Sequence, residues 1–265
     1  MRVVVTRPAS EAGHWVDALE AAGYQTLRLP LIDIAPAPDR GAIERAWTQW
    51  SRWQAVMFVS AQAVRFFFAC RPPGLQLLAH PTRCWATGPG TRKALLNAGV
   101  PSTLIDSPHE EAGQFDSEAL WRVVKAAVVP QLPVLIVRGT QTPDHNPSAQ
   151  TDDSGAGRDW LSQQLQASQV PVHFVVAYQR QMPAWSDAQR AQAEQAASDG
   201  SVWLMSSSQA VTHLSQTLPR HDWSRARGIA THARIALALQ GLRFAEIRVS
   251  RPVLGDVMAS LESLA

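Results

Sequence analysis

The sequence has little cysteine and little clustered charge. Its 265 residues include only two cysteines, Cys70 and Cys84, which form neither a CxxC pair nor a zinc-ligand spacing. We therefore expect two reduced thiols and exclude a disulfide framework. The net charge is only +2, and the 24 lysines and arginines form no clustered basic stripe of the kind that nucleic-acid-binding proteins carry. An anionic partner of this chain is therefore expected to be a small molecule and not a nucleic acid.

Long apolar runs are missing too. No segment approaches the length that crosses a bilayer, and residues 1–8 read as the start of a strand without the apolar core of a signal peptide. We expect a cytoplasmic protein with no membrane partner. Hydrophobic residues still make up 46% of the chain, and its length suits two domains.

The short signatures of common cofactors and nucleophiles are also absent. The eight histidines show no HExxH or other paired ligand spacing, so no metal is expected. The turn Gly88-Pro89-Gly90 fits neither GxxxxGK[ST] nor GxGxxG, and no Gly-x-Ser-x-Gly elbow occurs. A nucleotide-dependent enzyme would also carry a ribose-binding acid roughly 20 residues after its first strand, and Asp33 lies beyond that distance. The sequence predicts no cofactor.

What the sequence does contain is an alternation of strand and helix patterns. The expected strands are 3–6, 26–34, 55–60, 84–87, 134–138, 172–180, 201–206, 228–231 and 245–250. Several are apolar on both alternations, which is typical of strands covered by helices on both faces. Helices are expected from a cap at Ser10, from a cap at Ser117, from a capping box at 186–189 and over 253–264, while 140–157 reads as a surface loop. This order predicts an α/β fold of open, flavodoxin- or Rossmann-like parallel sheets.

The pattern occurs twice along the chain. Residues 59–64 (VSAQAV) resemble 206–211 (SSSQAV), Ala86-Thr87 resembles Ala230-Thr231, and the early strand ending at Arg7 resembles the middle strand ending at Arg138. Three matches in the same order predict two similar α/β domains. Two extended, proline-flanked stretches, 27–38 and 172–183, are expected to join them as a two-stranded β linker. The predicted domains are 1–36 with 179–265, and 37–178.

Small polar residues cluster at the carboxyl ends of the expected strands, where open parallel sheets bind ligands. They are Thr6 and Arg7; Ser60, Ala61 and Gln62; Gly88 and Thr91; Arg138 and Gly139; Ser206, Ser207 and Ser208; and Thr231 and His232. Taken singly, such residues are mostly helix caps, tight turns and surface ion-pair partners. Their joint placement at equivalent points of two halves, mostly before helices whose N–H groups attract anions, favours a cleft that binds a polycarboxylate.

Tyr178 is one of only two tyrosines and stands late in the strand 172–180. A tyrosine in a strand usually packs its ring and keeps its hydroxyl wet. The alternative is a weak acid that points into the cleft. On the residues alone, the packing interpretation is favoured.

These segments together resemble the uroporphyrinogen-III synthase family. The ordered matches are 4–8 (VVTRP), 29–32 (LPLI), 58–64 (FVSAQAV), 86–91 (ATGPGT), 137–139 (VRG), 176–180 (VAYQR), 206–211 (SSSQAV) and 230–232 (ATH), which cover essentially the whole chain. The resemblance implies two α/β domains joined by a two-stranded ladder, with the active site in the cleft between them. It also implies a monomer that uses no cofactor.

The implied reaction closes hydroxymethylbilane, a linear tetrapyrrole with eight carboxylates, to uroporphyrinogen III with loss of water and inversion of ring D. Tyr178 matches the tyrosine that the family places in the cleft. Two departures concern the geometry of carboxylate contacts: extra loop residues follow Arg138-Gly139, and Ala233 stands where many relatives have proline. A binding module that captures a polycarboxylate without reaction remains the alternative.

Overall fold

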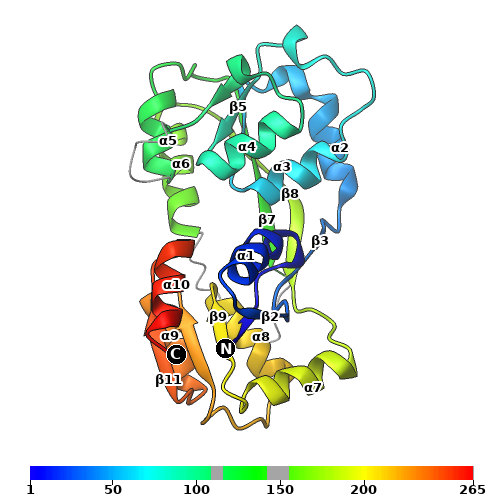
Figure 1. The fold of residues 1–265 in the computed structure, drawn as a ribbon. Coiled ribbons are helices and arrows are strands. Elements are labelled where there is room, and N and C mark those ends of the chain that lie inside the picture. The colour runs from blue at the N-terminus through cyan, green and yellow to red at the C-terminus, as the bar shows by residue number, and fades with distance from the viewer. Residues whose placement is uncertain (109–115, 142–154, 265) are drawn as a thin grey trace. The chain divides into compact units, whose positions relative to one another are not determined.

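The structure is a computed structural model that describes residues 1–108, 116–141 and 155–264. The chain divides into two compact units (Figure 1). Unit 1 comprises Met1–Ile34 and Gln181–Ala265, and unit 2 comprises Ala35–Arg180. Each boundary lies two residues from the boundary expected from the sequence, which placed them after residues 36 and 178.

Unit 1 is built on a five-stranded parallel sheet with the order β11-β10-β9-β1-β2. Its strands are β1 (Arg2–Val5), β2 (Gln25–Arg28), β9 (Val202–Met205), β10 (Arg227–Ala230) and β11 (Glu246–Val249). Val3, Val4 and Val5 are all fully buried because helices cover both faces of the sheet. Continuous apolar strands of this kind are the mark of a doubly covered parallel sheet.

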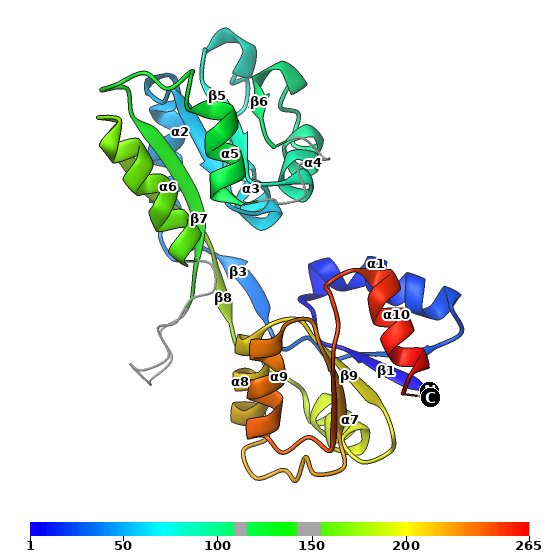
Figure 2. The same ribbon diagram turned by 90° about the vertical axis from the view of Figure 1, so that its left-hand side faces the viewer.

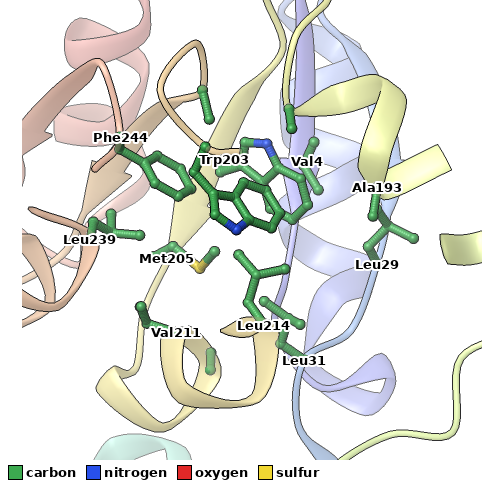
Figure 3. Close-up of a cluster of buried hydrophobic side chains, with 14 of the residues drawn as sticks. Val4, Leu29, Leu31, Ala193, Trp203, Met205, Val211, Leu214, Leu239 and Phe244 are labelled. Carbon is green, nitrogen blue, oxygen red and sulfur yellow. The ribbon is translucent and has the colours of Figure 1, made fainter. Parts of the chain in front are cut away.

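Alternate side chains of unit 1 feed two separate cores. Val3 and Val5 pack against α1 (Ala9–Ala21) and α10 (Leu254–Glu262). Val4 and Trp203 point the other way, toward α7 (Asp187–Ala196), α8 (Ser208–Thr217) and α9 (Ala233–Gly241). Figure 3 shows the second core, where the Trp203 indole lies among Leu214, Met205 and Phe244.

Unit 2 holds a six-stranded sheet with the order β3-β8-β7-β4-β5-β6. Its strands are β3 (Asp33–Pro36), β4 (Ala55–Phe58), β5 (Arg83–Ala86), β6 (Ile105–Asp106), β7 (Val134–Gln141) and β8 (Val172–Gln181), and the pairs from β8 to β6 run parallel. One face is covered by α5 (Ser117–Val124) and α6 (Gly155–Ala167), which lie side by side (Figure 2). The other face carries α2 (Arg40–Thr48), α3 (Ala61–Phe68) and α4 (Pro89–Asn97), with Phe58 packed on Phe67.

The two sheets are equivalent strand for strand. The series β8-β7-β4-β5-β6 of unit 2 corresponds to β2-β1-β9-β10-β11 of unit 1. The repeated sequence motifs occupy matching places, because 59–64 follow β4 and 206–211 follow β9. The internal duplication is thus visible in the topology, although the chain visits the equivalent strands in a different order.

Several expected elements need correction. The predicted strand 26–34 is two strands, β2 and β3, which belong to different sheets and are separated around Pro30. A proline lacks the N–H group that a ladder needs, so the interruption has a physical cause. Helix α2 and the two-residue strand β6 were not predicted.

The expected caps were partly wrong. Helix α1 begins at Ala9 after Pro8, one residue before Ser10, and α5 is capped by Asp116, whose side chain accepts from the Ala119 N–H. The capping box at Ser186 and Gln189 is confirmed. Of the expected loop 140–157, residues 140 and 141 complete β7 and 155–157 begin α6, while 142–154 lie outside the described residues.

Strands β3 and β8 are neighbours in the sheet, and both cross the unit boundary. The Ala37 N–H donates to the Ala177 carbonyl at 3.2 Å, which continues their pairing. The chain thus passes between the units only along this pair of strands. Among the described residues, no helix has the length and apolar character to span a membrane.

Candidate active site

Each sheet has one point where the strand order reverses, here called its switch point. In unit 1 it lies between β1 and β9, and in unit 2 between β4 and β7. Crevices at the carboxyl ends of strands beside such a reversal are the usual ligand sites of open α/β sheets. Most of the predicted site residues lie at or after the carboxyl ends of these four strands. Thr6, Arg7, Ser206, Ser207 and Ser208 follow β1 and β9 in unit 1; Ser60, Ala61 and Gln62 follow β4 in unit 2, and Arg138 and Gly139 lie in the last half of β7.

The remaining predicted residues follow the next strands along each sheet. Gly88 and Thr91 come after β5, and Thr231 and His232 come after β10. The sequence-predicted residues therefore gather at one edge of each sheet, at equivalent places. No residue of the set falls at the opposite edge of its sheet.

Five helices begin at or just after residues of this set: α1, α3, α4, α8 and α9. The caps of the last four differ. Ser60 accepts from the Ala63 N–H at 3.2 Å, and His232 accepts from the Arg234 N–H at 3.1 Å through Nδ1, so these two side chains act as ordinary caps. Gly88 before α4 and Ser207 before α8 make no side-chain cap to the described part of the helix. The first-turn N–H groups of α4 and α8 receive no cap from the side chain that precedes the helix, which suits them to an anionic ligand.

Three of the predicted polar residues are turned inward. The Thr6 hydroxyl donates to the Leu204 carbonyl at 2.7 Å, and the Thr231 N–H donates to the Met205 carbonyl at 3.0 Å. Thr91 is 6% exposed inside α4. The Thr6 hydroxyl and the Thr231 backbone N–H thus tie neighbouring strand ends together, and the side chains of Thr6, Thr91 and Thr231 are all buried. Gln62 is likewise buried, and Ala61 at the start of α3 is exposed.

Arg7 is a partly buried cation at the switch point of unit 1. Its guanidinium carbon lies 4.3 Å from the centroid of the Trp15 ring. Burial lowers the pKa of Arg7, and Glu11 acts in the opposite direction. Its Nε is enclosed and finds no hydrogen-bond partner within the described residues. A cation with reduced hydration attracts a carboxylate more strongly than one that water surrounds.

Two further polar atoms at the switch point of unit 1 are buried without a partner among the described residues: Ser208 Oγ and Gln209 Oε1. They follow β9, whose Leu204 pairs with Val5 of β1, so they share the switch point with Arg7. An enclosed polar atom without a hydrogen bond costs about 1–3 kcal/mol, and natural proteins tolerate few of them. Their accumulation at one switch point is what a site built for a polar ligand would show.

Gln209 was missed by the sequence prediction, although a signal was present. The prediction named Gln62 after β4, and the repeat aligns Gln62 with Gln209 after β9. A residue-by-residue comparison of the two repeats would have identified Gln209 as the counterpart of Gln62.

Tyr178 lies at the switch point of unit 2 and is only 2% exposed. Its hydroxyl oxygen is 3.1 Å from Ser60 Oγ. Its ring stacks on Phe66 with centroids 6.1 Å apart and an interplanar angle of 22°. It also covers Gly139, where a Cβ atom would stand 2.5 Å from Cε2 of the tyrosine ring. The packed ring expected from the residues is confirmed, and the hydroxyl contacts Ser60.

Arg138 stands on the other face of the same sheet. Its guanidinium carbon lies 4.6 Å from the centroid of the Phe174 ring. Phe174 pairs with Ile136, which packs with α5 and α6, whereas Tyr178 faces α3. The structure therefore does not bring Arg138 and Tyr178 together, although both were predicted site residues.

Two hollows lie away from the switch points. One, of about 570 Å³ at the amino edge of the unit 1 sheet, includes Arg2, Asp199 and Arg227, and the other, of about 250 Å³ beside β5 and β6, includes Arg83 and Asp106. Arg2 pairs with Asp199, Arg83 pairs with Asp106, and Arg227 donates to two backbone carbonyls. Because these charged groups are already paired within the protein, we assign no ligand to either hollow.

Comparison with known proteins adds a family and two solved structures. The family model described as Uroporphyrinogen-III synthase HemD matches residues 13–254. A crystal structure of uroporphyrinogen-III synthetase from Helicobacter pylori is 16% identical, covers 100% of both chains and has a TM-score of 0.59. A mutant uroporphyrinogen III synthase from the extremely thermophilic bacterium Thermus thermophilus is 16% identical, covers 100% of this chain and 98% of its own, and has a TM-score of 0.53. At 16% identity the solved structures support the fold alone. The family model covers most of the chain, from within α1 to the start of α10.

Proposed function

The chain belongs to the uroporphyrinogen-III synthase family, and we propose that Tyr178 and the polar edges at the two switch points carry its reaction. The enzyme is a cyclising lyase of tetrapyrrole biosynthesis that converts hydroxymethylbilane to uroporphyrinogen III. What remains to be assigned is how the residues of this chain do so.

The reaction begins when the terminal hydroxyl of the linear tetrapyrrole departs as water. The substituted carbon of ring D then attacks the carbon that lost the hydroxyl, and a spiro intermediate rearranges so that ring D is inverted in the product. A substrate left to itself would close at the unsubstituted position of ring D and give the symmetric isomer. The enzyme's main task is therefore geometric, because it must hold a flexible chain in the conformation that brings the substituted carbon forward.

We propose that the Tyr178 hydroxyl donates a hydrogen bond or a proton to the departing hydroxyl. The observation that carries this is the phenol oxygen held 3.1 Å from Ser60 Oγ at the switch point of unit 2, in a side chain that is 2% exposed. A phenol is a weak acid at neutral pH, since its ordinary pKa is near 10. Precise placement in a dry surrounding compensates for weak acidity.

The carboxylates of the substrate need several separate anion contacts. We propose that the open N–H groups at the starts of α4 and α8, together with Arg7 and Ser208, supply them. Backbone amides hold anions through hydrogen bonds and the helix dipole, so few charged side chains are required. Unit 1 carries such groups at its switch point, and unit 2 carries them after the neighbouring strand β5, so we propose that the carboxylates of one tetrapyrrole are shared between the two units.

Further details of the working enzyme belong to the same proposal. We propose that it acts as a cytoplasmic monomer and that it needs no cofactor. The support is chemical: the cyclisation has no net redox change and transfers no group to a carrier, so a proton donor, anion contacts and a shaped site are sufficient.

The experiment is an isomer assay on the purified protein with freshly prepared hydroxymethylbilane. We expect the type III isomer from the wild type, and we expect Tyr178→Phe to lower kcat about ten- to hundredfold while the isomer stays type III. Tyr24→Phe, the other tyrosine, serves as the matched control and should keep full activity. A wild type that yields only the type I isomer at the uncatalysed rate would refute the function, and an unchanged kcat in Tyr178→Phe would remove Tyr178 from the reaction.

A further inference from the structure

We infer that Ser60, Gly139 and Phe66 are positioning residues that hold the Tyr178 phenol, so that the side chains of Ser60 and Phe66 and the bare Cα of Gly139 serve the tyrosine and not the carboxylates of the substrate. This inference rests on the proposed role of Tyr178. It changes the assignment of two residues that the sequence placed in substrate binding, and it adds Phe66, which the sequence did not single out.

An irregularity in the sheet sets the direction of Tyr178. Arg138 pairs with Val176, but the next residue of β7, Gly139, pairs with Tyr178, so Ala177 is an extra residue in β8. Such a bulge redirects the side chain that follows it. In a regular ladder Tyr178 would share the face of Val176 and Arg138, and the bulge turns it to the face that α3 covers. The Ala177 carbonyl accepts from the Ala37 N–H at 3.2 Å, which anchors the bulged residue to the chain that follows β3.

Gly139 makes room for the ring after this turn. A Cβ atom at residue 139 would stand 2.5 Å from Cε2 and 2.9 Å from Cε1 of Tyr178, and it would crowd Cζ as well. Real Cβ atoms do not approach ring carbons so closely, so any other residue would displace the phenol. The requirement for glycine here is therefore one of space and not of backbone conformation.

Ser60 fixes the hydroxyl end of the ring. Its Oγ accepts from the Ala63 N–H at 3.2 Å and lies 3.1 Å from the Tyr178 hydroxyl. A serine hydroxyl has one proton and two lone pairs. With one lone pair used by the cap, Ser60 can donate its proton to the phenol oxygen, and this leaves the phenol proton for the departing hydroxyl of the substrate. The same contacts leave the Ser60 side chain poorly suited to hold a carboxylate.

Phe66 fixes the plane of the ring. It lies on α3, the helix that Ser60 caps, and its ring stacks on Tyr178 at 6.1 Å with an interplanar angle of 22°. The cap, the stacking ring and the phenol thus depend on one helix. A shift of α3 would move Ser60 and Phe66 together. Ser60, Gly139 and Phe66 thus form a frame that holds the hydroxyl and the ring of Tyr178 in one position.

The test is a double-mutant cycle between Ser60 and Tyr178, read as kcat and KM for formation of the type III isomer. Ser60→Gly removes the hydroxyl but keeps a residue that is accepted at helix N-caps, and Ser60→Thr keeps a hydroxyl for both contacts. We expect Ser60→Gly to lower kcat by up to about tenfold, the size of one lost hydrogen bond, with KM unchanged. Ser60→Thr should restore most of the rate. In a Tyr178→Phe background, Ser60→Gly should have no further effect on kcat.

Gly139→Ala provides a second cycle that does not depend on the cap. We expect it to lower kcat at least as much as Tyr178→Phe and to lower the Tm, and the loss of Tm should disappear in a Tyr178→Ala background, where the added methyl group has space. Gly13→Ala is the matched control, because a Cβ atom at Gly13 meets no described atom within 4 Å.

The possible outcomes distinguish a failure of the positioning role from a failure of the proposed role of Tyr178. A raised KM with unchanged kcat in Ser60→Gly would make Ser60 a substrate contact and overturn the inference, and so would fully additive losses in either cycle. If Tyr178→Phe itself keeps full kcat, the proposed role of Tyr178 fails and the frame loses its purpose. If the wild type makes no type III isomer, the function fails before either question arises.

Discussion

At the scale of single residues, Arg7 is the charged side chain on which substrate binding is proposed to depend most. Its guanidinium is stacked on Trp15 and partly buried, and its Nε has no partner among the described residues. Arg7→Gln removes the charge and the unpaired donor together. We expect KM for hydroxymethylbilane to rise about tenfold with little change in kcat, the size of a charge-assisted hydrogen bond.

Steady-state kinetics on the wild type and three variants test this expectation. Arg7→Lys keeps the charge but not the planar fork, so its KM should lie between those of the wild type and Arg7→Gln. Arg40→Gln is the control, because Arg40 is exposed and pairs with Glu44 on the surface of α2. A KM in Arg7→Gln equal to that of the control would exclude Arg7 from the substrate site.

Cys84 gives the stability a defined dependence on pH. Burial raises the pKa of its thiol from 9.0 to about 12. Because the folded pKa lies above the unfolded one, the thiol favours the folded state fully below pH 9, and this contribution is lost as pH rises from about 9 toward 12. We expect urea titrations to show the wild type losing about 1 kcal/mol between pH 8 and pH 10 that Cys84→Ala does not lose. Equal losses in the two proteins would contradict the burial of the thiol.

The sequence predicted where the small polar residues lie in the fold but not which contacts their side chains make. The small polar residues do gather at the carboxyl edges, because the alternation of strands and helices dictates where strands end. The sequence did not show that the Thr6 hydroxyl donates to the Leu204 carbonyl or that Ser60 Oγ lies 3.1 Å from the Tyr178 hydroxyl. Those contacts join residues more than one hundred positions apart, and local pattern carries no information about them.

At the scale of secondary-structure elements, the helix α7 is the clearest product of local sequence. Ser186 accepts from the Gln189 N–H, and the Gln189 side chain accepts from the Ser186 N–H in return. Ser186→Ala should lower the free energy of unfolding by about 1 kcal/mol, since the Gln189 N–H at the helix start loses its acceptor. Urea denaturation measures this, with Ser198→Ala, an exposed serine, as the control. A loss no greater than that of Ser198→Ala would show that the box contributes nothing.

Other elements were decided by tertiary structure. Ser117 and Asp116 are both good cap residues and are adjacent, so sequence alone could not choose between them, and the structure uses Asp116. The strand β6 has only two residues and forms because it pairs with β5, which no periodicity reveals. The split of 26–34 into β2 and β3 was announced by Pro30, but the assignment of the two strands to different sheets was not.

At the scale of the whole molecule, the duplication organises both fold and site. Equivalent strands hold equivalent places in two sheets, and each sheet offers one switch point with polar residues around it. The halves are chemically different at that point. Unit 1 carries a cation and polar atoms that have no partner among the described residues, whereas unit 2 carries a buried phenol beside Ser60. In the proposed reaction the edge of unit 1 binds anions, and the edge of unit 2 combines the N–H groups of α4 with a proton donor.

The sequence predicted this difference between the two units only in part. The repeats in the chain were sufficient to predict two similar α/β domains and the sheet edges at which we propose that the substrate binds. The distinct chemistry of each edge depends on burial, on the bulge at Ala177 and on the stacking of Phe66, which are properties of packed side chains. No pattern of residue types along the chain encodes them separately.

The central proposal is that the carboxyl-end edges of both sheets hold one tetrapyrrole at once. A crystal structure with uroporphyrinogen III bound tests it most directly. The account predicts carboxylates within hydrogen-bond distance of Arg7 and of the first N–H groups of α8 in unit 1, and of the first N–H groups of α4 in unit 2, with Tyr178 facing the macrocycle. A product molecule held by one unit alone, or bound away from these strand ends, would contradict it.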